Sequence, residues 1–270
     1  MLIAIGITRL VRLSRIVPRG AADVWVKLEY YNPTGSYKDR MALSMIERAE
    51  QRGTLKPGMT VVEYTGGSTG ISLAFVCAVK GYRCRIVCND AVALEKRRSM
   101  EVFGAELEVL KSEGGKLTPD LVPRMMARAR EIAAEGPSYA TDQMRNPDMV
   151  AGYEPLGEEL VEQVRPIHAF CAAVGTSGMI MGTGRVLRRH DPKIRIVALE
   201  PTTSAVRAMV GGRRQHPGDF NRAFQARRQT GSAINPIVCH SACTISSGTR
   251  SSRSASSPTA AASALTSPRG

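Results

Sequence analysis

Lys38 stands at a position where a lysine can become a nucleophile. Pro33 and Gly35 form a turn before it, and Ser36 is a residue type that commonly caps a helix. The apolar residues that follow recur at helical spacing: Met41, Ala42, Met45, Ile46 and Ala49. Lys38 is therefore predicted in the first helical turn, where the helix dipole disfavours a cation and makes loss of its proton easier. On this segment alone, a solvated surface lysine is the simpler alternative.

Two stretches rich in small residues are suited to binding anions. They are 63–70, which reads EYTGGSTG, and 174–179, which reads VGTSGM. Each follows a predicted strand and precedes a predicted helix, where main-chain N–H groups converge. Together with Lys38 they favour a nucleophilic amine over a surface lysine. For 174–179 taken by itself, a plain turn between strand and helix is the alternative.

Five motifs follow one another along the chain: KLEYYNPTGSYKDR, VVEYTGGSTGISLA, TDQMRNP, VGTSGM and IVALEP. In order and spacing they resemble the cysteine synthase and cystathionine β-synthase branch of the pyridoxal-phosphate enzymes with the tryptophan-synthase-β fold (fold type II). The resemblance implies an enzyme domain over residues 1–205, with an α/β, two-lobed, three-layer fold built on parallel sheets. The cofactor would lie between the lobes, residues 40–145 would form the smaller, mobile lobe, and the C-terminal lobe would be incomplete.

The resemblance also implies the chemistry of Lys38. In this family the matching lysine forms a Schiff base with pyridoxal 5′-phosphate and later removes the α-proton of an amino acid. The implied reaction is β-replacement or β-elimination on an activated serine, with a sulfur donor as the second substrate, in L-cysteine biosynthesis. A serine or threonine ammonia-lyase of the same fold is the close alternative, although SYKDR matches the sulfur branch better.

The loop after the second predicted strand corresponds to the family's Thr-Ser-Gly-Asn-Thr segment, which holds the substrate carboxylate. The implied substrate-binding residues are Thr65, Gly66, Gly67, Thr69 and Gln143. Ser68 replaces the family's asparagine, which donates a hydrogen bond to the 3′-oxygen of the cofactor. A serine hydroxyl also donates a hydrogen bond but reaches less far.

The second small-residue loop corresponds to the family's phosphate loop, usually Gly-Thr-Gly-Gly-Thr. The implied cofactor-binding residues here are Gly175, Thr176, Ser177, Gly178 and Met179. Met179 replaces a threonine and so removes one hydroxyl donor. We therefore expect weaker cofactor binding that is not abolished.

Two charged residues next to Lys38, Asp39 and Arg40, are predicted to have a solvated or structural role at the helix start rather than a catalytic one. Near the N-terminus, Ile7 and Arg9 stand where the family usually has asparagine and proline. We therefore expect this first loop to differ from the family pattern.

The elements that must position these residues alternate between strands and helices, as in a parallel sheet with covering helices. Strands are predicted over residues 24–28, 59–62, 84–88, 106–110, 138–141, 170–174 and 194–199. Helices are predicted from the lysine turn to residue 52, from residue 71 to a stop at Gly81, and over 92–103, 119–134, 149–164 and 178–190.

The formal net charge of +13 is concentrated at the C-terminal end. Residues 201–270 hold nine arginines and one acid, Asp219, which accounts for +8 of that charge. Residues 206–270 are rich in arginine, serine and alanine and do not resemble the family, so we predict a disordered tail. A change of reading frame is our hypothesis for its origin. A disabled enzyme remnant whose basic tail binds acidic partners is the alternative function, while nucleic-acid binding is not implied.

The remaining composition predicts no metal site and no membrane-spanning segment. Cys77, Cys84, Cys88 and Cys171 lie in apolar runs and are predicted to be buried thiols of a cytoplasmic protein. The motif Cys239-His240-Ser241-Ala242-Cys243 has no second pair of ligands at zinc-finger spacing. A homodimer is expected if the fold is complete.

Overall fold

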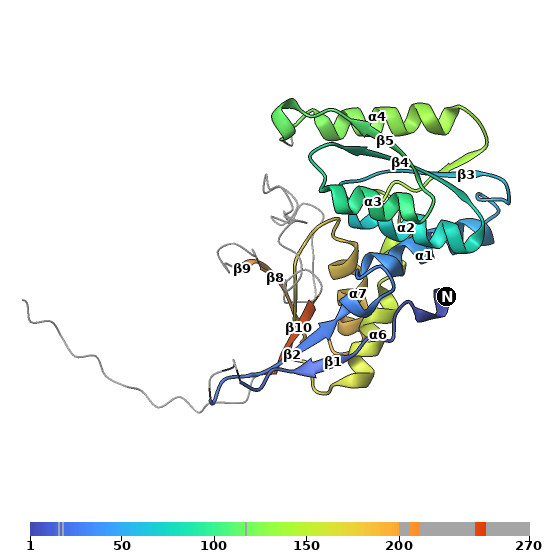
Figure 1. Ribbon diagram of the computed structural model, residues 1–270. Coiled ribbons are helices and arrows are strands. Elements are labelled where there is room, and N and C mark those ends of the chain that lie inside the picture. The colour runs from blue at the N-terminus through green and yellow to red at the C-terminus, as the bar shows by residue number, and fades with distance from the viewer. Residues whose placement is uncertain (16, 18, 117, 200–205, 211–240, 247–270) are drawn as a thin grey trace, which may run out of the picture.

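A computed structural model describes residues 1–199, 206–210 and 241–246, apart from residues 16, 18 and 117. Within these residues the chain forms two lobes, each built around one sheet (Figure 1). The lobes are joined through α1 (Lys38–Gln51), which contacts α2 (Ser68–Lys80) of one lobe and α5 (Asp148–Ala151) on the side of the other. The predicted two-lobed α/β fold is confirmed.

The smaller sheet has four parallel strands in the order β5-β4-β3-β6. They are β5 (Glu106–Leu110), β4 (Arg83–Asn89), β3 (Thr60–Tyr64) and β6 (Ser138–Ala140). The strands β3 and β4 are almost continuously buried, as expected for parallel strands covered on both faces. The predicted range 40–145 contains this sheet, and its mobility stays a prediction.

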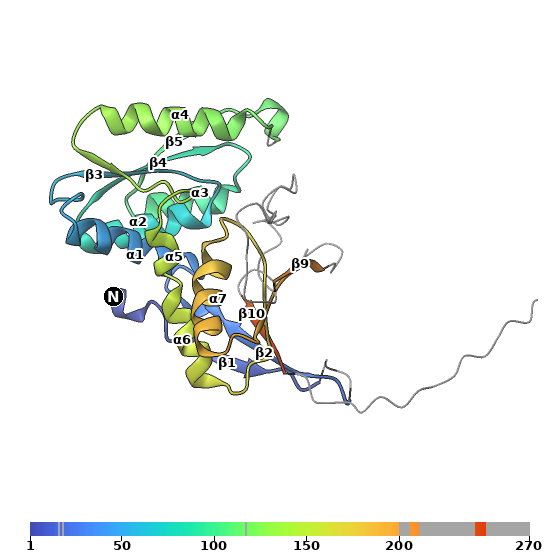
Figure 2. The same cartoon turned by 180° about the vertical axis from the view of Figure 1, so that it is seen from behind.

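Helices cover both faces of the smaller sheet. Figure 1 shows α4 (Leu121–Ala134) on one face and α2 with α3 (Leu94–Val102) on the other, and the view from behind agrees (Figure 2). The helix α2 ends as predicted at Gly81, whose φ of 79° is the left-handed conformation that glycine adopts most readily.

The larger sheet has six strands in the order β1-β2-β10-β7-β8-β9. They are β1 (Leu10–Arg12), β2 (Asp23–Leu28), β10 (Ser241–Ser246), β7 (Ala169–Ala172), β8 (Arg195–Leu199) and β9 (Val206–Val210). Only β7 and β8 pair in parallel, and the other neighbours are antiparallel. The helices α6 (Glu154–Gln163) and α7 (Gly178–His190) pack against each other beside this sheet.

Two local predictions need correction, and one short strand was missed. The helix predicted over 149–164 is two helices, α5 and α6, and the short strand β1 was not predicted. Ser36 is not the N-cap of α1, because Tyr37 occupies that position. The Ser36 hydroxyl instead accepts a hydrogen bond from the Lys38 N–H at 3.1 Å, so it still stabilises the helix start.

The C-terminal range predicted to be disordered contains two strands, β9 and β10. The strand β10 pairs with β2 on one side and β7 on the other, so it occupies the interior of the larger sheet. The disorder of the range 206–270 as a whole stays a prediction. The rest of the predicted tail, including Cys239 and His240, lies outside the described residues.

Two glycines allow α7 to approach α6 and the end of α5 closely. A Cβ atom on Gly157 would lie 2.6 Å from the Val186 Cβ, and one on Gly182 would lie 2.2 Å from the Val150 carbonyl oxygen. Both distances are shorter than atoms tolerate, so one added methyl group would push the helices apart.

Gly157→Ala is expected to lower the free energy of unfolding by about 1–3 kcal/mol through overpacking. The measurement is urea denaturation of the full-length chain at fixed protein concentration. Gly136→Ala is the matched control, because a Cβ atom there meets nothing within 4 Å. Equal stability of the two variants would show that α6 and α7 are not tightly packed at Gly157.

Candidate functional site

The amine of Lys38 lies in a nearly closed environment at the first residue of α1. The residue is only 9 % exposed, and its Nζ donates a hydrogen bond to the Thr176 hydroxyl at 3.2 Å. The sulfur atom of Met41 lies 3.7 Å from Nζ, and the centroid of the Tyr37 ring lies 5.4 Å away. The fold therefore brings together Lys38 and Thr176, which the sequence placed in the same predicted site.

Burial lowers the pKa of Lys38 to about 8, and the negative charge of Glu63 opposes this effect only in part. The direction agrees with the sequence prediction, but the cause differs. The sequence argument rested on the helix dipole, whereas the main cause in the structure is loss of water around the ammonium group. At neutral pH an appreciable fraction of this amine is uncharged.

The predicted phosphate loop joins β7 to the start of α7. Ser177 is the N-cap with φ 66°, and α7 begins at Gly178, so the first N–H groups of the helix have no partner within it. A Cβ atom on Gly175 would meet only the Tyr37 hydroxyl, at 3.9 Å. Open space beside free N–H groups, next to the amine of Lys38, fits the phosphate of pyridoxal phosphate.

Two residues of this loop face the core. A Cβ atom on Gly178 would lie 2.9 Å from the Met149 sulfur, so a larger residue there would clash. Met179 is buried within the main apolar cluster. Its side chain packs in the interior. The sequence analysis interpreted this position only as the loss of a hydroxyl donor and did not predict its packing role.

The loop Thr65–Thr69 follows β3 and leads into α2. The Thr65 hydroxyl accepts a hydrogen bond from the Gly67 N–H at 3.2 Å. Gly67 has φ 149°, a backbone conformation that other residues rarely adopt, so glycine is favoured there. The flexible Lys96 side chain lies close by, with its Cδ 2.7 Å from where a Cβ atom would be. Ser68 is half-buried as the first residue of α2, and Gly66 is exposed.

Gln143 joins this loop across the carboxyl end of the smaller sheet. Its Oε1 accepts a hydrogen bond from the Thr69 hydroxyl at 2.6 Å, and its Nε2 donates to the Tyr64 carbonyl oxygen at 3.4 Å. The structure thus places Gln143 beside the loop with which the sequence grouped it. Its role in binding a carboxylate stays a prediction.

Glu63 is a residue of the site that the sequence analysis did not single out. Its carboxylate accepts hydrogen bonds from the Thr141 hydroxyl at 2.7 Å, the Gln143 N–H at 3.0 Å and the Tyr64 N–H at 2.9 Å. Burial raises the pKa of Glu63 to about 7, against the effect of these hydrogen bonds. The signal in the sequence was an acidic residue within the apolar strand TVVEY.

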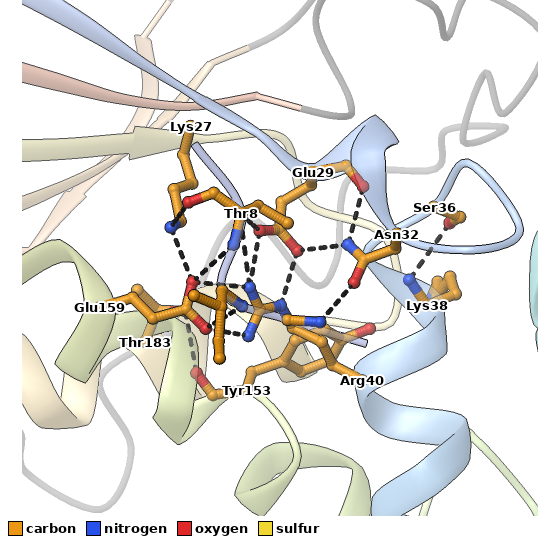
Figure 3. A network of polar contacts seen from close by, with 12 residues as sticks. Thr8, Lys27, Glu29, Asn32, Ser36, Lys38, Arg40, Tyr153, Glu159 and Thr183 are labelled. Atoms are coloured by element: carbon orange, nitrogen blue, oxygen red, sulfur yellow. Dashed lines mark hydrogen bonds and ion pairs between the residues drawn. The ribbon is translucent and has the colours of Figure 1, made fainter. Parts of the chain in front are cut away.

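Asp39 and Arg40 have structural roles, but neither is solvated. Asp39 accepts hydrogen bonds from the N–H and the hydroxyl of Thr34, at 2.8 and 2.5 Å, and so fixes the turn before Lys38. Arg40 is buried between the carboxylates of Glu29 and Glu159 (Figure 3). Of the two predicted alternatives, a solvated or a structural role at the helix start, the structural one is confirmed. Asp39 has its partner in the turn just before the helix, and Arg40 has its partners on other elements.

The altered first loop takes part in the same network. Ile7 has φ 49°, which is unfavourable for a β-branched residue, and its N–H donates to Glu159 Oε1 at 3.0 Å. Lys27, with no exposed surface, contacts Glu159 Oε2 at 2.6 Å. Burial opposes the charge of Glu159, yet hydrogen bonds and charge from Arg40, and then from Lys27, lower its pKa to about 2.

Other predictions concern metals, thiols and membranes. Across the described residues, no group of three or more histidine, cysteine or acidic side chains is arranged to hold a metal ion. The predicted buried thiols are confirmed, because the four cysteines named there are buried and form no disulfide: Cys77, Cys84, Cys88 and Cys171. None of the helices in the described ranges is long and apolar enough to cross a bilayer.

Comparison with known proteins agrees with the geometry. Residues 1–243 match the family model described as pyridoxal-phosphate dependent enzyme, and this match extends past residue 205, where the sequence resemblance was expected to end. Cysteine synthase of Staphylococcus aureus (strain Mu50 / ATCC 700699) is 44% identical over 207 residues, which are 75% of this chain and 64% of the relative. Cysteine synthase B of Escherichia coli (strain K12) is 40% identical over 220 residues, which are 80% of this chain and 69% of the relative.

Solved structures give the same result. The structure of O-ureido-L-serine synthase matches with a TM-score of 0.66 and 36% identity, over 76% of this chain and 63% of that chain. Cysteine synthase from Entamoeba histolytica matches with a TM-score of 0.66 and 35% identity, over 76% and 61%. The chain spans less than two thirds of the length of the Staphylococcus relative and of both solved structures. With a family match over most of its length and a site that fits the cofactor, this chain belongs to the family of pyridoxal-phosphate dependent enzymes.

Proposed function

We propose that this chain binds pyridoxal phosphate through Lys38 and catalyses β-replacement on an activated serine, with a sulfur donor as the second substrate, as in L-cysteine biosynthesis. The observation that carries the proposal is the buried amine of Lys38, hydrogen-bonded to Thr176 in a loop at the N-terminus of α7. The similar cysteine synthases, 40–44% identical, support the choice of reaction.

Each loop has a proposed role in this reaction. The phosphate of the cofactor would be held by main-chain N–H groups and hydroxyls of the α7 loop: Gly175, Thr176, Ser177, Gly178 and Met179. The carboxylate of the amino acid would be bound by the other loop and its neighbour: Thr65, Gly66, Gly67, Thr69 and Gln143. Ser68, at the start of α2, would donate a hydrogen bond to the ring oxygen of the cofactor.

Pyridoxal phosphate, when bound, supplies an electron sink that lets the α-proton and the β-substituent of an amino acid depart. The chain supplies the base and the orientation. The Lys38 amine, with its lowered pKa, accepts and returns a proton near neutral pH, and Thr176 holds its Nζ in place. Glu63 accepts a hydrogen bond from the Gln143 N–H and so would hold the residues that bind the carboxylate at a fixed position relative to the Lys38 amine.

The compartment and the assembly follow from the same proposal. Four buried thiols that form no disulfide suit the reducing cytoplasm, where the amino-acid substrate and sulfide would be available. A homodimer is the assembly expected from the resemblance, and size-exclusion chromatography with light scattering would measure it.

The reaction is tested by incubating the full-length chain with pyridoxal phosphate and following products by mass spectrometry. O-Acetylserine with sulfide is expected to give cysteine. Release of ammonia and a 2-oxo acid from serine or threonine, without cysteine formation, would indicate the ammonia-lyase instead. No turnover of either substrate, in a chain that still captures the cofactor, would indicate a disabled remnant.

Lys38→Ala is expected to abolish covalent capture of pyridoxal phosphate, because this side chain supplies the attacking amine. The protein is treated with the cofactor and borohydride, and the labelled peptide is mapped by mass spectrometry. Lys56→Ala, which removes an exposed lysine, is the control and should retain labelling at Lys38. Label at another lysine in the unmodified chain would refute the assignment.

The rate of cofactor capture is expected to depend on pH with a midpoint near 8. Only the uncharged amine attacks, so below the Lys38 pKa of about 8 the rate should fall about tenfold per pH unit, and above it the rate should level off. Stopped-flow absorbance measures this rate. Nα-acetyllysine, with an ordinary amine pKa of about 10.4, is the reference and should keep rising to higher pH. A protein profile that follows the reference would mean that the Lys38 amine is solvated.

A further inference from the structure

Arg40 follows Lys38 by two residues and points to the other side of the helix. With 3.6 residues per turn, side chains two positions apart project in nearly opposite directions from an α-helix. Lys38 reaches Thr176 on one side of α1. Arg40 reaches Glu29 and Glu159 on the other side (Figure 3). The first turn of α1 is thus held from both sides.

The guanidinium of Arg40 makes paired hydrogen bonds to two carboxylates. Its Nε and Nη2 donate to Glu29 at 2.7 and 2.9 Å, and its Nη1 and Nη2 donate to Glu159 at 2.6 and 2.9 Å. Paired bonds of this kind fix the plane and direction of the guanidinium, which a single contact does not. Glu29 lies after β2 and Glu159 lies in α6, so α1 is tied to two other elements.

Both carboxylates are themselves anchored. Asn32 Nδ2 donates to Glu29 Oε2 at 3.0 Å, and the Lys27 Nζ lies 2.6 Å from Glu159 Oε2. With Arg40, the network holds two cations and two carboxylates in a buried region, so its charges balance. Removing one partner would leave a buried charge without compensation and would be strongly destabilising.

We propose that Arg40 is a positioning residue for Lys38: its bonds to Glu29 and Glu159 fix the rotation of the first turn of α1 and thereby hold the Lys38 amine away from water. This inference rests on the proposed function, in which Lys38 is the reacting amine. Arg40 itself makes no contact with that amine in the structure, so its effect would pass through the helix backbone.

The pKa of Lys38 depends on how well its amine is kept from water, so it can be used to measure this positioning. The groups facing the amine are Thr176 from the α7 loop, Met41 and Tyr37 from its own segment, and the charge of Glu63 from β3. Glu63 raises the pKa of Lys38, and burial, which lowers it, is the larger effect. If the first turn rotates and admits water, the burial effect weakens and the pKa rises toward the ordinary lysine value.

The test measures the pH at which Lys38 becomes reactive in the full-length chain without cofactor. Trace labelling with acetic anhydride over a range of pH, followed by peptide mass spectrometry, gives a midpoint for this one amine. Arg40→Lys keeps the charge but loses the paired geometry, and Arg40→Met removes both. We expect the midpoint to rise by about one pH unit or more in both, which is a tenfold smaller neutral fraction at pH 7.

Arg52→Met is the matched control at the other end of α1. Its guanidinium also pairs with a carboxylate, that of buried Asp148, at 3.0 and 2.5 Å. General weakening of α1 would therefore occur in this variant too, but Lys38 should keep its normal midpoint. An equal shift in Arg52→Met would overturn the proposal, since the effect would then be one of helix stability.

Further variants test the positioning role of Arg40 if the first ones do not fold. If Arg40→Met does not fold, the test uses Arg40→Lys and Glu159→Gln instead. In Glu159→Gln, Arg40 keeps Glu29 as a partner, so we expect a smaller rise of the Lys38 midpoint. A normal midpoint in folded Arg40→Lys and Glu159→Gln would refute the positioning role. A raised midpoint in a chain that captures no pyridoxal phosphate would leave the positioning role standing and would reject the proposed function.

Discussion

Keeping the Lys38 amine out of water is the constraint on which the rest of the site depends. An ammonium group loses favourable hydration on burial, and the fold meets this cost in two ways. Thr176 accepts a hydrogen bond from Nζ, and the carboxylate of Glu63 contributes an attractive charge. Neither restores full hydration, so the amine gives up its proton more readily than a surface lysine does. The reactivity of the Lys38 amine is thus a consequence of hydration that the protein replaces only in part.

Such a residue cannot be placed by its own contacts, because those contacts are few. The structure uses the two residues that follow it instead. Asp39 secures the preceding turn through Thr34, and Arg40 secures the opposite side of the helix through Glu29 and Glu159. Replacing a buried ion network with apolar residues is often neutral for stability. The role of this network would then be to fix the rotation of the first turn of α1, which apolar contacts define less strictly than paired hydrogen bonds do.

Much of the site could be predicted because its parts are local in sequence. The turn before Lys38 and the two small-residue loops are recognisable from residue types within ten positions. The network around Arg40 could not be predicted in the same way, since its carboxylates lie 11 and 119 residues away. A lone arginine or glutamate in a sequence looks like a surface residue, and only the fold shows that it is buried. For the same reason Met179 was interpreted as a lost hydroxyl, although its neighbours make it part of the core.

The strand β10 raises the question of how much of the site depends on the C-terminal end. This strand lies between β2 and β7, so the order of the larger sheet includes residues 241–246. The network around Arg40 joins the same parts of the fold by another route. It links the N-terminal segment and β2 to α6 through Glu159 and Gln163, using only residues that precede residue 164. The amine, its positioning contacts and both loops therefore lie within the first 180 residues, and the C-terminal strand supports this framework from the side of the sheet.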